Sequence, residues 1–214
     1  SALYGHDNYL KLENFDAVPD NISSIIKLFG DIQQETARQM SKHHQAVTHY
    51  LSEYGYIPLW VLVNVLTFGK VTMFYKLMKP QDKQNIARKF HVDAKELHKY
   101  MSLCGLARNQ CAHDERFFDL KFRWHLHTRS IANFSCLGLE RDKSGSYPSG
   151  TNDVYAIGIV FARLLGTADT AEFIASMSAA FSKLEQQLHT ISIKDVMRIM
   201  GYPAAWERLQ QLAR

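Results

Sequence analysis

The chain has 214 residues, of which 46% are hydrophobic, and its 25 basic and 21 acidic side chains leave a net charge of +4. This length suits one continuous core, so we expect a single domain over residues 1–214. The mild positive charge permits nucleic acid as a partner without demanding it. Three cysteines are too few for a disulfide framework, and the longest apolar run, Ile57 to Phe68, is too short for a bilayer, so we expect a cytoplasmic protein without membrane contact.

The first part of the chain shows helical periodicity. Pro19 predicts a helix start, and apolar side chains at helical spacing follow it, as one long helix or as two broken near Gly30. Gly55 ends this stretch. The next predicted helix runs from Leu59 to Met78 and is apolar nearly all round, which predicts a position at the centre of a helical bundle.

The middle of the chain holds a predicted helix that carries the candidate functional residues. After a short predicted helix from Gln81 to Phe90, Asp93 is placed to cap a helix that begins at about Ala94, with Glu96 at the capping-box position. Arg108 interrupts the apolar stripe of this helix, which indicates a groove or a partner surface. The other members of the stripe are Leu97, Met101, Cys104 and Cys111.

Periodicity is lost between Asp114 and Gly150. Aromatic and basic residues mix from Arg116 to Arg129, a composition that suits two readings equally. The segment could stack bases and contact phosphates, or its aromatic rings could close the bundle while its cations stay solvated. The candidate substrate-binding side chains in this region are Glu115, Arg116, Lys121 and Arg123.

Helical patterns return in the last third. A helix is predicted to start at about Thr151, and Asp169 and Ser192, each with an acidic residue three positions later, predict two further N-caps. Trp206 opens a last helix that runs to Arg214. Because no strand alternation of useful length occurs, the predicted fold class is all-α.

Three polar side chains near the end of the Ala94 helix carry the candidate chemistry. Asn109 and His113 are four residues apart and share a helix face, so the amide can orient the imidazole while its other nitrogen faces a substrate. Arg108 and His113 are five apart, about 140° around the helix, and do not share a face. In metal-free RNA cleavage, an imidazole takes the proton of a ribose 2′-hydroxyl and a cation stabilises the phosphorane. A symmetric dimer would add the acid that the leaving 5′-oxygen needs.

Other chemistries fit the sequence less well. The spacing of Arg108 and His113 arises often by chance, and its plain alternative is a surface arginine beside a helix-ending histidine. No histidine or cysteine set has zinc-ligand spacing, and the run from Phe68 to Thr72 lacks features of a phosphate loop, so we expect no metal and no cofactor. Cys111 is expected to be a small packing residue.

Three separated blocks carry a resemblance to a known family. Along the chain they are the pair Pro58–Val61 and Thr67–Val71, then Leu106–Phe117, and then Met200–Trp206. In this order they resemble Abi-type abortive-infection proteins of the AbiD/AbiF kind, in the HEPN superfamily, over about residues 50–209. Full-length relatives usually carry more sequence before the first block, which leaves open whether an N-terminal segment is missing.

The resemblance implies a HEPN-like helical bundle with additional C-terminal helices, and it implies a function. It places the active site at Arg108, Asn109 and His113, at the interface of a homodimer. The implied activity is that of a toxin in phage defence, a metal-independent endoribonuclease that leaves a 2′,3′-cyclic phosphate and a 5′-hydroxyl. The implied partners are substrate RNA and an antitoxin that is RNA or protein. Two alternatives remain, a non-catalytic RNA-binding or adaptor module and a structural helical dimerisation domain.

Overall fold

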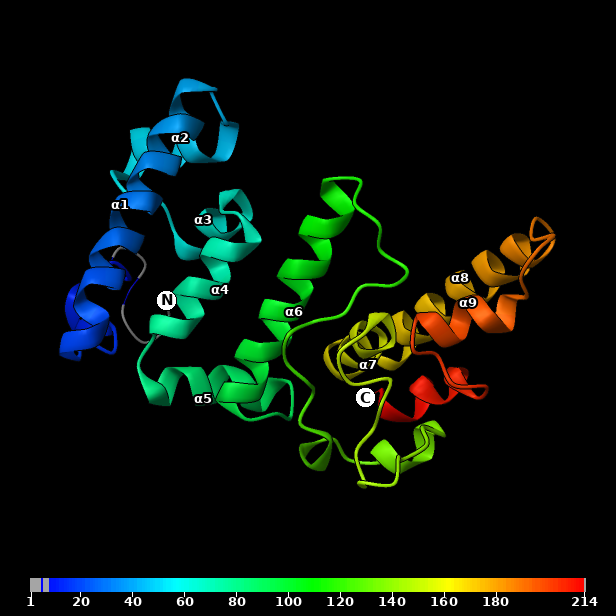
Figure 1. Cartoon of the computed structure of the whole chain (residues 1–214). Coiled ribbons are helices and arrows are strands. Elements are labelled where there is room, and N and C mark those ends of the chain that lie inside the picture. The colour runs from blue at the N-terminus through cyan, green and yellow to red at the C-terminus, as the bar shows by residue number, and fades with distance from the viewer. Residues whose placement is uncertain (1–4, 6–7, 214) are drawn as a thin grey trace. The chain divides into compact units, whose positions relative to one another are not determined.

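The computed structural model describes residue 5 and residues 8–213, and helices joined by turns and loops make up this part of the chain (Figure 1). No strand occurs among the described residues, and a single bridge between Phe15 and Met78 is their only extended pairing. The all-α prediction is therefore confirmed. Each described helix is too short or too polar to cross a bilayer.

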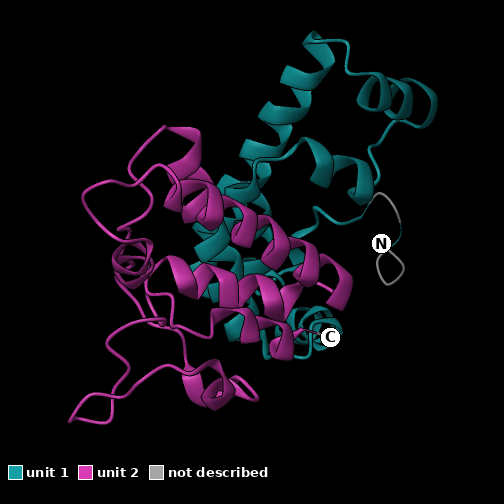
Figure 2. Ribbon diagram, turned by 90° about the vertical axis from the view of Figure 1, so that its right-hand side faces the viewer, with its two compact units in different colours: residues 1–105 teal, residues 106–214 magenta. Residues whose placement is uncertain are grey.

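The chain divides into two compact units, residues 1–105 and residues 106–214 (Figure 2). Helix α6 (Ala94–Ala112) runs across the boundary between them, and the candidate residues Arg108, Asn109 and His113 belong to the second unit. A division into units does not decide whether the units fold independently, so the single domain over residues 1–214 stays a prediction.

The first unit begins with a long helix whose start the sequence predicts correctly. Pro19 opens α1, and the helix continues through Gly30 and breaks only after residue 41. Gly55, with a φ of 75°, ends the following helix, as expected. The helices of this unit that precede α6 are α1 (Pro19–Ser41), α2 (Gln45–Tyr54), α3 (Leu59–Val65), α4 (Phe68–Leu77) and α5 (Pro80–Lys89).

The single helix predicted over residues 59–78 is two helices, α3 and α4. The chain turns extended at Leu66, and the Thr67 hydroxyl accepts a hydrogen bond from the Lys70 amide at 3.3 Å, which caps α4. The predicted central burial is also wrong, because Trp60 is 48% exposed and Phe68 is 42% exposed. A side-chain cap inside an apolar run produces a helix start that hydrophobic periodicity does not reveal.

The core of the first unit is a continuous apolar cluster centred on α1, α2 and α3. Ile25, Leu28 and Ile32 recur at helical spacing and give α1 one buried face. The Phe15 ring meets Phe29 and Phe74 edge to face, at centroid distances of 5.1 and 5.2 Å. Further buried members are Val47, Ile57, Val61, Leu62, Leu66 and Leu77.

The second unit is built around a buried helix and a set of aromatic rings. Its helices after α6 are α7 (Val154–Leu164), α8 (Thr167–Glu185) and α9 (Ile193–Ile199), and the 3-10 turn η4 (Trp206–Leu212) follows them. Phe181 of α8 and Trp206 of η4 both pack edge to face on Tyr202, at 5.3 and 5.5 Å. The Tyr155 ring of α7 lies 4.9 Å from the Tyr202 ring. The Tyr202 ring therefore joins α7, α8 and η4.

The helix starts of the second unit test the cap predictions. Ser192 and Asp195 form the capping box expected for α9. Asp169 is not an N-cap, because α8 begins earlier, after Gly166, and Asp169 lies inside its first turn. The last predicted helix is the 3-10 turn η4, and Arg214 lies outside the described residues.

Gly201 is the glycine whose replacement should cost most. It ends α9 with a φ of 85°, and a Cβ there would overlap the buried carboxylate of Asp153. We expect Gly201→Ala to lower the free energy of unfolding by about 2–4 kcal/mol, from left-handed strain and steric overlap together. Thermal or urea unfolding measures this loss.

Gly55→Ala is the matched control for that substitution. Gly55 has a similar φ of 75°, but its missing Cβ would face open space. The control should lose only about 1 kcal/mol, because backbone strain acts without overlap. Equal losses in the two variants would show that the Asp153 contact does not matter.

Candidate functional site

Helix α6 begins as the sequence predicts. The Asp93 carboxylate accepts a hydrogen bond from the Glu96 amide at 2.8 Å, which identifies Asp93 as the N-cap. The Glu96 side chain lies in the first turn of the helix and is buried. It accepts a hydrogen bond from the Tyr100 hydroxyl at 2.7 Å. These contacts fix the first turns of the helix that carries the candidate site at its other end.

The buried face of α6 differs from the predicted stripe. It runs along Leu97, Tyr100, Leu103 and Ala107, and Arg108 lies exposed beside it. Arg108 therefore does not interrupt the buried face, so the predicted position of the apolar stripe was wrong. A partner surface at Arg108 stays a prediction. Apolar side chains occur on more than one side of α6, as the 50% exposure of Leu106 shows, so sequence spacing alone does not identify the buried side.

The end of α6 is formed by a local backbone motif. The His113 amide still donates to the Asn109 carbonyl at 3.1 Å, so His113 closes the helical ladder. Asp114 has a left-handed φ of 51°, and the Glu115 amide turns back to the Gln110 carbonyl at 3.2 Å. This is the hydrogen bond of a Schellman motif, normally formed around glycine. Sequence reasoning missed Asp114, although aspartate is among the residues that tolerate this conformation.

The three predicted catalytic residues are all exposed at this helix end. The Arg108 Nη1 donates to the Asn109 Oδ1 at 3.2 Å, so the structure brings these two side chains together. Among the described residues, no hydrogen bond joins the Asn109 amide to the His113 ring, whose orientation by Asn109 stays a prediction. Five residues of helix place Arg108 about 140° around the axis from His113, so they leave the helix in different directions.

The four predicted substrate-binding residues have different surroundings. Glu115 and Arg123 are exposed. The Arg116 guanidinium pairs with the Asp119 carboxylate at 2.5 Å and lies 5.6 Å from the centroid of the Phe118 ring. The final member, Lys121, donates its Nζ to the Asp153 Oδ2 at 3.1 Å. Lys121 therefore binds a buried carboxylate, Arg116 is paired at the surface, and Glu115 and Arg123 face solvent.

The segment after the motif is attached to the core of the second unit. The Phe122 amide donates to the Asn152 carbonyl at 2.6 Å and the Leu126 amide to the Thr151 carbonyl at 2.7 Å. Phe122 and Leu126 are buried. Of the two readings of residues 116–129, this part of the segment matches the bundle-closing one, and the exposed arginines at positions 116 and 123 remain available for a polyanion.

Asp153 is a structural residue that sequence reasoning did not identify. Its carboxylate is fully buried and accepts hydrogen bonds from the Gly150 amide at 2.8 Å, the Ala156 amide at 3.3 Å and Lys121. Its position two residues after Thr151 and directly before an apolar helix is an N-cap signal. Burial, together with the negative charge of Asp153, raises the pKa of the Tyr202 hydroxyl, which stays neutral at physiological pH.

The cysteines and the acidic residues suggest no further chemistry. Burial raises the pKa of the Cys104 thiol to about 11, which makes it a poor nucleophile. Cys111 is exposed, so its expected packing role was wrong. Both are free thiols. Within the described residues, no group of three or more histidine, cysteine or acidic side chains could hold a metal ion.

The left-handed residue after His113 gives a testable consequence. We expect Asp114→Val to lower the free energy of unfolding by about 1–2 kcal/mol, because a β-branched side chain is strained at this φ. Asp114→Gly should keep or raise stability. Glu115→Val is the matched control, since it removes the same charge one residue later. Chemical unfolding measures the difference, and equal losses at positions 114 and 115 would rule out backbone strain as the cause.

Comparison with known proteins gives a family match. A family model described as Abi-like protein matches residues 1–119, a range that includes Arg108, Asn109 and His113. The third block of the resemblance, residues 200–206, lies outside this range. No curated protein and no solved structure matches significantly. Because the matched range covers more than half of its 214 residues, this chain belongs to the Abi-like protein family.

Proposed function

We propose that this protein is a metal-independent endoribonuclease that acts in phage defence. Its family membership supports abortive infection as the setting. The observation that carries the nuclease proposal is the exposure of a cation, an amide and an imidazole, Arg108, Asn109 and His113, at one helix end. HEPN superfamily membership, the AbiD/AbiF subtype and an RNA or protein antitoxin are parts of the same proposal and rest on the resemblance.

Each of these side chains has a role in the proposed reaction. His113 exchanges a proton with the ribose 2′-hydroxyl or with the leaving 5′-oxygen. Arg108 stabilises the negative charge that develops on the phosphorus oxygens. Asn109, which accepts from Arg108 at 3.2 Å, holds the guanidinium near the substrate phosphate. The products are a 2′,3′-cyclic phosphate and a 5′-hydroxyl.

The proposed active unit is a homodimer. Arg108 and His113 leave α6 in directions about 140° apart. The two side chains of one copy therefore do not both contact the same phosphate. A second copy related by a two-fold axis brings its own arginine and histidine next to those of the first copy. Two imidazoles then supply one base and one acid.

The first test is RNA cleavage without metal. We expect the purified protein to cut single-stranded RNA in EDTA, and His113→Ala to reduce the rate on the order of 10²–10⁴-fold, because the proton transfer loses its side chain. Denaturing gels and end-group analysis measure the rate and the cyclic phosphate. His189→Ala, which removes an exposed histidine in the turn after α8, is the matched control and should keep full activity. Full activity of His113→Ala would refute the proposal.

The second test concerns the shared site. If each site needs two copies, activity per chain should fall on dilution below the dimer dissociation constant, in proportion to the dimer fraction. Sedimentation velocity gives that fraction in the buffer used for cleavage. Constant activity per chain in a monomeric sample would exclude a site shared between copies.

The alternative function is RNA binding without cleavage. The exposed side chains of Arg116 and Arg123 favour it, because such cations attract a polyanion whether or not His113 reacts. Salt-dependent RNA binding by a wild-type protein that never cleaves would select this alternative.

A further inference from the structure

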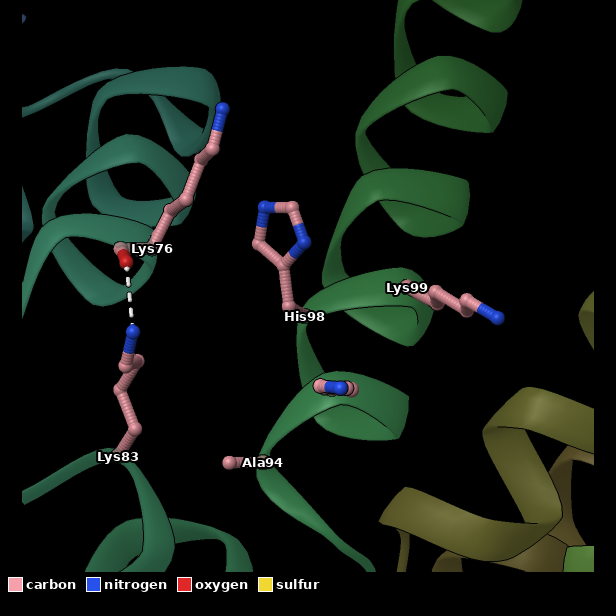
Figure 3. A pocket seen from close by; sticks show the side chains of 6 residues that line it. Lys76, Lys83, Ala94, His98 and Lys99 are labelled. Carbon is pink, nitrogen blue, oxygen red and sulfur yellow. Dashed lines mark hydrogen bonds between the residues drawn. The ribbon is translucent and has the colours of Figure 1, made fainter. Parts of the chain in front are cut away.

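A second candidate site lies wholly within the first unit. A cavity of about 290 Å³ opens between α4, α5 and the first turns of α6, and we call it the lysine pocket (Figure 3). Among the described residues that line it, none is acidic. The lining residues are Lys76, Lys83, Ala94, Lys95, His98 and Lys99.

The frame of the lysine pocket is held by one buried hydroxyl. The Tyr75 hydroxyl of α4 lies 3.1 Å from the Lys83 carbonyl of α5 and 3.1 Å from the Ala94 carbonyl of α6. The Tyr75 side chain is only 4% exposed. The Lys83 Nζ also donates to the Lys76 carbonyl at 3.1 Å, a bond drawn in Figure 3. Three helices are therefore fixed around the cavity before any ligand binds.

Positive charge in the lysine pocket is only partly balanced by the protein. Lys83 lies 3.9 Å from the Asp16 carboxylate. Within the described part of the chain, Lys76, Lys95 and Lys99 form no ion pair. Figure 3 shows Lys99 extending away from the gap between α4 and α6, so the attraction for an anion comes from the other lysines of the pocket.

The half-buried His98 is affected by the positive charge of the lysine pocket. Its ring lies on the side of α6 that faces Lys76 (Figure 3). Burial, with the charges of Lys76 on α4 and Lys83 on α5, lowers the pKa of His98. The ring is therefore neutral at pH 7 and can donate one hydrogen bond to an anion without adding to the repulsion. The acidic side chains at the start of this helix have other partners, because Asp93 accepts from the Glu96 amide and Glu96 accepts from the Tyr100 hydroxyl.

We propose that the lysine pocket binds a phosphate group, carried by a free nucleotide or by an RNA chain. A phosphate offers several acceptor oxygens to ammonium groups that approach from different helices. A planar carboxylate is matched better by the fork of an arginine, and no arginine lines the pocket in the described residues. The proposal does not depend on catalysis by His113.

The experiment follows the His98 ring by NMR in the full chain. The His113→Ala variant is used so that RNA stays intact, and His98→Gln assigns the signal. We expect adenosine 5′-monophosphate to shift the His98 signal and raise its pKa, because the phosphate offsets the lysine charges. Adenosine, which lacks the phosphate, should leave the signal unchanged.

A second probe distinguishes the source of the phosphate. An oligoadenylate with a 5′-hydroxyl end carries only phosphodiesters. A response to this oligonucleotide but not to the monophosphate identifies an RNA backbone, and the reverse identifies a free nucleotide. If neither probe moves the His98 signal, the proposal is wrong, whatever the outcome of the cleavage assay.

Paired variants distinguish phosphate binding in the lysine pocket from unspecific electrostatic attraction. Lys76→Gln with Lys95→Gln removes two pocket cations, and we expect binding to weaken at least about tenfold. The control pair, Lys27→Gln with Lys42→Gln, removes two exposed cations away from the pocket and should bind as before. Equal weakening in both pairs would indicate unspecific electrostatic attraction and overturn the proposal.

Discussion

The second unit depends on a carboxylate that has no access to solvent. Asp153 caps α7, accepts the Gly150 amide and pairs with Lys121, and Gly201 packs against it without a side chain. A buried charge is tolerated only where donors surround it, so these contacts together stabilise the Asp153 carboxylate in the core. The irregular segment that follows the candidate motif is thereby tied to the helical core.

Helix α6 carries two different candidate sites at its two ends. Its first turns contribute Lys95 and His98 to the lysine pocket, whose helices are joined by the Tyr75 hydroxyl. Arg108 lies near its C-terminal end, and His113 directly follows its last residue. Both sites suit phosphate chemistry, one by binding and one by proposed cleavage.

The sequence predictions succeeded where the interactions act between residues close together in the chain. The starts of α1 and α6 and the capping box at Ser192 were predicted because caps act within one turn. The break at Thr67 was missed because the surrounding apolar run reads as one continuous helix. For the site, sequence identified three residues that prove exposed. It did not show that Arg108 binds Asn109 instead of interrupting a buried face.

By itself, the sequence determined the helical class, the starts of α1, α6 and α9, and the polar triplet at the end of α6. Those features depend on backbone geometry and on spacing within one element. Only the tertiary structure decided that Lys121 neutralises a buried aspartate and that lysines from three helices surround one cavity. Such arrangements join residues far apart in the chain. The periodicity of one helix does not predict which distant side chains will contact that helix.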